Sequence, residues 1–253
     1  MDERRQSQTE EQEVTHPELE APSPSVWSVA RVPVALLVLT FLLSWWAYGQ
    51  LPETVTVRTL FTGRHVSPES AVHFAFQLPF ITAAIIGLNL AGMRWNVMLW
   101  PRVPMKAGDA EAMRPLVAYN FSVVVAMAGL IHAFSLGTGL GWVAEPAGLR
   151  GAGVTLGLAF ILLGNVLPLV TRPNTFIGFR ASVLYGDRVR WSNAQRVAGY
   201  TYVVCGLVLA AGFAIDPLGF TRMLMPLLAV AIVAPLLLAR TQVPPASGRG
   251  SRA

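Results

Sequence analysis

The chain has 253 residues, of which 53% are hydrophobic and only 13% are charged, and its mean hydropathy is +0.51. Soluble domains carry about 25% charged residues, so this composition indicates a protein of the lipid bilayer. The net charge of +5 is also what basic cytoplasmic loops produce, and we expect no nucleic-acid partner. The single cysteine, Cys205, excludes a disulfide within the chain and a cysteine-ligated metal site.

Residues 1–26 are rich in Glu, Gln, Ser and Pro and have no apolar face. Such a segment cannot bury enough surface to offset the entropy of ordering, so a disordered cytoplasmic tail is predicted. Its acidic residues, and the long apolar run that follows it, argue against a secretory signal. Residues 241–253 are predicted to form a second flexible cytoplasmic tail.

Six apolar runs follow the first tail, each of about 20 residues, which as a helix crosses a hydrocarbon core of about 30 Å. None alternates apolar and polar residues as a barrel strand does. The predicted fold class is therefore an all-α, polytopic integral membrane protein with about six transmembrane helices. The fifth run is the least sharply defined, because its first turn is polar. The runs are Ser28–Tyr48, His73–Met93, Pro115–Leu136, Gly151–Val170, Ala194–Phe213 and Thr221–Ala239.

The runs divide the chain into two three-helix regions. Residues 27–136 form the first, with an extracytoplasmic loop over 50–72, and residues 137–240 form the second, with a cytoplasmic connector over 171–193. If the N-terminus lies inside, fifteen of the 19 Lys and Arg residues fall on inside segments. The positive-inside rule then predicts that both ends are cytoplasmic.

Aromatic residues that prefer the membrane interface fall near the ends of the runs. They are Trp27, Trp45, Trp46, Tyr48, Trp95, Trp100, Trp142 and Trp191.

No hydrolase, metalloprotease, nucleotide-binding or paired-cysteine motif is present, and we expect no enzyme activity, cofactor or metal. The acidic residues avoid the apolar runs, which weakens an ion-coupled transporter. His132 allows two interpretations: a proton relay or substrate contact, or an interfacial histidine bonded to a neighbouring helix. Gln77 and Asn89 are expected to bond across helices.

Small residues and prolines predict how the helices pack. The pairs Gly153 with Gly157 and Gly206 with Ala210 would let two helices approach closely. Asn165 is expected either to satisfy the carbonyl that Pro168 frees or to contact a ligand. The prolines at 79, 168, 226 and 235 are also candidates for broken helices around a transport site.

The segment Gly164–Gly199 is the most informative part of the chain. It is much longer than the two to eight residues that a helix connection needs. Its arginines, which suit anionic lipid head groups or an acidic partner, are Arg172, Arg180, Arg188, Arg190 and Arg196. Within NTFIGFR, Gly178 can supply a turn with positive φ and Asn174 can cap the backbone, which indicates a built loop.

The string GNVLPLVTRPNTFIGFR, followed by WSNAQRVAG, resembles the signature region of the SdpI family. These multi-span bacterial membrane proteins are named after an immunity protein against a secreted killing peptide. The residues ASVL at 181–184 replace the usual TPWT of the family, and Gln195 replaces the usual His. The matching positions are Gly164, Asn165, Leu167, Pro168, Asn174, Gly178, Arg180, Trp191, Arg196 and Gly199.

A second string, LPETVTVRTLFTGR, resembles the short outer loop of a domain of unknown function that often precedes the SdpI signature. Leu51, Pro52, Val55 and Gly63 fit its pattern, whereas Thr56 and Arg58 replace the usual Pro and His.

The two resemblances imply a protein of the bacterial cell membrane that gives immunity to a membrane-active peptide toxin or signals to a cytoplasmic repressor. A small-molecule transporter or permease accessory, and a structural partner in an envelope complex, are the alternatives. The candidate binding residues are Asn165, Pro168, Asn174, Gly178, Arg180, Trp191, Gln195 and Arg196, with Leu51, Pro52, Arg58 and Gly63 on the outer loop.

Overall fold

The computed structural model describes residues 26–56, 68–95, 107–171, 177–178, 184 and 188–241. The tail predictions fall outside these ranges, except at Val26 and Thr241, which belong to helices, and so do the predictions for Arg58, Gly63, Trp100, Arg172, Asn174 and Arg180.

Six helices are long and apolar enough to cross a membrane, which confirms the predicted all-α polytopic fold. A 3-10 turn, η1 (Leu167–Leu169), follows the fourth of them, and two short strands, β1 (Thr54–Val55) and β2 (Glu69–Ser70), pair antiparallel. The helices are α2 (Val26–Tyr48), α3 (Ala71–Trp95), α4 (Ala107–Gly139), α5 (Glu145–Val166), α6 (Arg188–Ile215) and α7 (Pro217–Thr241).

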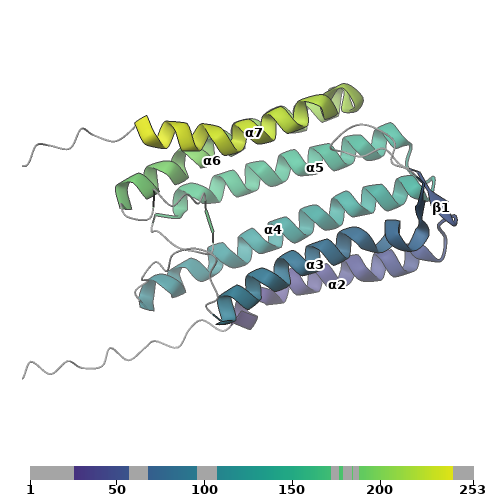
Figure 1. Ribbon diagram of the computed structural model, residues 1–253, viewed down its shortest axis with the longest axis horizontal. Coiled ribbons are helices and arrows are strands. Elements are labelled where there is room, and N and C mark those ends of the chain that lie inside the picture. Colours follow the sequence, from purple (N-terminus) through teal and green to yellow (C-terminus); the bar gives the residue numbers. More distant parts are fainter. Residues whose placement is uncertain are drawn as a thin grey trace, which may run out of the picture.

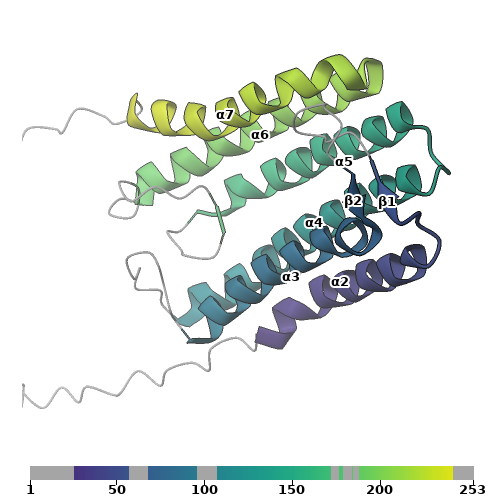
Figure 2. The ribbon, with the colours of Figure 1, turned by 45° about the vertical axis from the view of Figure 1, so that its right-hand side comes forward.

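The helices lie side by side in two groups, α2 to α4 and α5 to α7, which meet where α4 packs on α5 (Figures 1 and 2). The β1–β2 ribbon lies at the end of the bundle where α4 turns into α5, and this end is called the outer end. The opposite end, where α2 begins and α7 ends, is called the inner end, and the distribution of arginines predicts that it is cytoplasmic.

Proline ends α5. Pro168 has no N–H to continue the helical ladder, and α5 stops at Val166 before the chain enters η1. In contrast, α3 continues through Pro79, and α7 continues through Pro226 and Pro235. The expectation that these three prolines break their helices is therefore wrong.

Glycine packing joins α5 to α6, as the small-residue spacing predicted. A Cβ atom at Gly157 would lie 2.6 Å from the carbonyl oxygen of Gly206, and one at Gly206 would lie 2.6 Å from the carbonyl oxygen of Gly157. One turn towards the outer end, Gly153 faces the ring of Phe213. The two backbones touch because no side chain separates them.

Topology can be tested with single cysteines in a Cys205→Ser background. Thr54 is exposed at the outer end and Arg188 is exposed at the inner end. We expect a membrane-impermeant maleimide to label Thr54→Cys on intact cells and Arg188→Cys only after permeabilisation. The reverse pattern would contradict cytoplasmic ends.

Candidate functional site

The connector between α5 and α6 contributes to the hydrophobic core at the inner end. Val170, Ile177 and Leu184 are each at most 3% exposed. They belong to one apolar cluster with Trp191 of α6 and with residues of the first helical group: Val29 of α2, Ile86 of α3, and Met113, Val117, Phe121 and Val125 of α4. The cluster contains residues of both helical groups. The described apolar residues of the connector are therefore part of the hydrophobic core.

Trp191 anchors the start of α6 beneath the connector. Its side chain is 0% exposed, and its Nε1–H donates to the carbonyl oxygen of Val170 at 2.8 Å. The prediction that Trp191 is an interfacial anchor is therefore wrong, because the indole finds its acceptor inside the protein. Other residues of that group are exposed near helix ends, as predicted: Trp27, Trp45, Trp46, Tyr48 and Trp142.

Gln195 lies one turn further along α6 and is also fully buried. Gly178 packs against the side-chain amide of Gln195. A Cβ atom at position 178 would lie 2.7 Å from Gln195 Oε1. The φ angle of Gly178 is +107°, which confirms the predicted turn with positive φ. Glycine is thus required here both by the backbone conformation and by the space that the amide occupies.

Three residues of the family resemblance meet between α5 and α6. A Cβ atom at Gly199 would lie 2.6 Å from the carbonyl oxygen of Gly164 and 2.7 Å from Pro168 Cδ. Because Pro168 has no N–H, the Gly164 carbonyl lacks its usual helical donor and faces Gly199 instead. Asn165 is exposed, so Gly199 rather than the Asn165 amide covers this carbonyl.

Exposed arginines lie towards the same end of the bundle as this packed site. Arg188 and Arg196 of α6 are exposed, and so are Arg31 of α2 and Arg114 of α4, which lie towards the same inner end. The 28 residues of α6 extend about 42 Å, which exceeds a hydrocarbon core of about 30 Å. The first turns of α6 therefore suit the head-group region.

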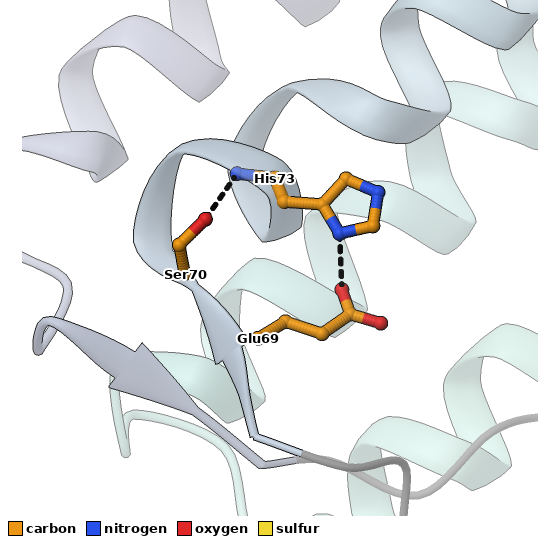
Figure 3. Close-up of polar contacts among 3 residues, drawn as sticks. All are labelled: Glu69, Ser70 and His73. Carbon is orange, nitrogen blue, oxygen red and sulfur yellow. Dashed lines mark hydrogen bonds and ion pairs between the residues drawn. The ribbon is translucent and has the colours of Figure 1, made fainter.

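The outer loop is pinned at both of its described ends. Val55 is 3% exposed and packs near Phe74 and Gly139. Ser70 Oγ accepts a hydrogen bond from the backbone N–H of His73 at 3.3 Å, and Glu69 pairs with His73 Nδ1 at 3.3 Å (Figure 3). Of the predicted loop residues, Leu51 is half-buried against the bundle and Pro52 is exposed.

Polar contacts inside the first helical group differ from the sequence predictions in part. His132 is 2% exposed and bonds Ser44 of α2 at 2.8 Å, as the interpretation of a histidine bonded to a neighbouring helix expects. Asn89 instead donates to Ile85 of its own helix at 2.7 Å, and Gln77 is exposed. Sequence reasoning did not identify Ser44, because an isolated serine in an apolar run has no distinguishing pattern.

No family model, curated protein or solved structure matches the chain. Within the residues that the structure describes, no group of three or more His, Cys, Asp or Glu side chains gathers in a way that would hold a metal ion.

Proposed function

We propose that this multi-pass membrane protein acts in the manner of the SdpI family, in the cell membrane of a bacterium. It protects its host from a membrane-active peptide toxin, signals to a cytoplasmic regulator, or does both. One observation carries the proposal. Three pairs of residues from the segment that resembles the family signature make close contacts at the inner end: Gly164 with Gly199, Gly178 with Gln195, and Trp191 with Val170.

The outer loop supports a role in meeting the toxin. Its ribbon is held on the bundle by Val55, and Ser70 caps α3 directly after the ribbon. The β1–β2 ribbon is therefore a preformed surface at the outer end, and a preformed surface loses less entropy when a peptide binds to it.

The inner end supports a role in signalling or in holding lipid. Exposed arginines there suit anionic head groups, each contributing about 1 kcal/mol near the surface. The same charges suit an acidic patch on a cytoplasmic repressor. Because the connector packs on both helical groups, a movement of one group relative to the other would be felt at the inner surface. The uninterrupted α3 and α7 lack the broken helices on which the transporter alternative depended.

Survival of a sensitive strain tests this function. The chain is expressed in a bacterium that lacks its own immunity protein, and the purified killing peptide of the SdpI system is added. We expect the cells to keep their membrane potential, measured with a voltage-sensitive dye, and to survive. Unchanged killing, with the protein present in the membrane, would exclude immunity to this peptide.

A pair of arginine variants sharpens the same experiment. Arg180→Ala changes a residue of the signature and is expected to abolish protection while the protein stays in the membrane. Arg188→Ala removes the same charge from an exposed position outside the signature and is expected to leave protection intact. Equal effects of both variants would mean that net charge, rather than the signature, matters.

A further inference from the structure

Four buried polar side chains lie inside the otherwise apolar first helical group: Thr40 and Ser44 of α2, Thr82 of α3 and His132 of α4. Ser44 and His132 make the contact between helices, with 2.8 Å between Ser44 Oγ and His132 Nε2. Ser44 Oγ also lies 3.0 Å from the carbonyl oxygen of Thr40 in its own helix. Thr82 bonds only its own helix, at Leu78.

Pro79 leaves a backbone carbonyl of α3 without its usual hydrogen-bond donor, and His132 lies where it can replace that donor. In a helix, the N–H of residue 79 would donate to the carbonyl of Ala75, and proline has no N–H to give. The imidazole of His132 also hydrogen-bonds the backbone of Ala75. One imidazole can reach both partners: an N–H donates to the carbonyl that Pro79 leaves free, and Nε2 lies against the Ser44 hydroxyl, whose single proton is shared with the carbonyl of Thr40.

This geometry also resembles a serine nucleophile beside its histidine base. Ser44 is 0% exposed and His132 is 2% exposed, however, so a substrate carbonyl has no access to the hydroxyl. The three groups instead connect three helices, because α2, α3 and α4 each contribute one of them. We call Ser44, Ala75 and His132 the polar clamp.

The polar clamp lies directly beneath the fixed ends of the outer loop. Ala75 lies four residues after the start of α3, which follows β2 without a break. The N–H of Ala71 donates to the carbonyl of Glu53 at 3.1 Å. On α4, His132 lies two turns below Gly139. A Cβ atom at Gly139 would lie 2.7 Å from the ring of Phe74 and 3.2 Å from Val55 Cγ1. The elements that carry the ribbon are thus the elements that His132 ties together.

We infer that His132 is a positioning residue, whose imidazole holds α2 and α3 against α4 and so seats the β1–β2 ribbon on the outer end of the bundle. Under the proposed function this ribbon frames the loop that meets a toxin. The placement of the ribbon can be measured without any toxin, so the inference and the proposed function can fail separately.

The test measures how often Val55 leaves its packed position. Val55→Cys is made in a Cys205→Ser background and treated with a membrane-impermeant maleimide on intact cells, and the exposed neighbour Thr54→Cys serves as the reference at full access. We expect Val55→Cys to react slowly when the polar clamp is intact. Adding His132→Leu should raise its labelling rate about tenfold, because the buried carbonyl of Ala75 loses its donor and Ser44 loses its contact with α4.

Three further variants separate positioning from a general loss of structure. Ser44→Ala removes one arm of the polar clamp and should give a smaller increase, whereas Ser135→Ala removes a hydroxyl that bonds only Ile131 of its own helix and should give none. His132→Gln keeps a donor and an acceptor and should restore slow labelling.

Two outcomes would overturn the inference. The first is that Val55→Cys reacts equally fast with and without His132→Leu. The second is that Ser135→Ala accelerates labelling as much as Ser44→Ala does. If the His132→Leu protein does not reach the membrane, Ser44→Ala decides the matter, because an unchanged rate in that variant contradicts the polar clamp.

Discussion

Replacing Gly199 with alanine is expected to destabilise the contact between α5 and α6 by about 3 kcal/mol, the upper part of the range for overpacking a core. The new methyl group would lie 2.6 Å from the carbonyl oxygen of Gly164 and 2.7 Å from Pro168 Cδ. Neither neighbour can turn aside, because one is backbone and the other is a closed ring. Unfolding of the purified protein in increasing SDS, followed by helical circular dichroism, measures the loss.

Gly87→Ala is the matched control for this prediction. Gly87 also lies within a membrane helix, but a Cβ atom there would meet no atom within 4 Å. Alanine should therefore be neutral or slightly stabilising at position 87, because it has the higher helix propensity. Equal unfolding midpoints for the two variants would show that the close approach of α5 and α6 contributes nothing to stability.

Replacing Trp191 with alanine is expected to release the connector from the bundle. The indole is fully buried, and truncating a buried tryptophan typically costs about 3–5 kcal/mol. The carbonyl of Val170 also loses its donor. Because the connector contains several arginines, trypsin added to inside-out vesicles should cut the Trp191→Ala protein much faster than the wild type. Cleavage sites are identified by mass spectrometry.

Two further variants show whether faster cleavage is specific to Trp191 and which of its interactions matters. Trp142→Ala truncates a tryptophan that is 58% exposed and should not change cleavage within the connector. Trp191→Phe keeps most of the buried surface but removes the N–H, so it separates packing from the hydrogen bond and should give an intermediate rate. Wild-type cleavage in Trp191→Ala would contradict the anchoring of the connector by this residue. Under the proposed function, the same variant should also lose protection against the peptide.

The fold was predictable because each apolar run reports directly on the free energy of entering a bilayer. The small residues of the fourth and fifth runs also indicated close helix packing, although only the structure showed that Gly157 faces Gly206. Gly178 was recognised as a turn residue from its neighbours in NTFIGFR. These features depend on residues close together in the chain, so they can be read directly from the sequence.

Partners were harder to predict, because hydropathy does not say which face of a helix meets which neighbour. Trp191 near a helix end suggested the membrane interface, yet it donates to Val170, 21 residues earlier in the chain. Asn89 was expected to hydrogen-bond another helix, but its amide donates to the carbonyl of Ile85, one turn earlier in its own helix.

Composition and residue spacing by themselves determined that this protein is a six-helix membrane protein with a long, arginine-rich connector between its fourth and fifth helices. The tertiary structure decided which polar groups satisfy one another: Trp191 with Val170, Gln195 against Gly178, and His132 with Ser44 and Ala75. The physical reason is that a buried polar group must find a partner in an apolar medium. Which partner it finds depends on how the helices pack together.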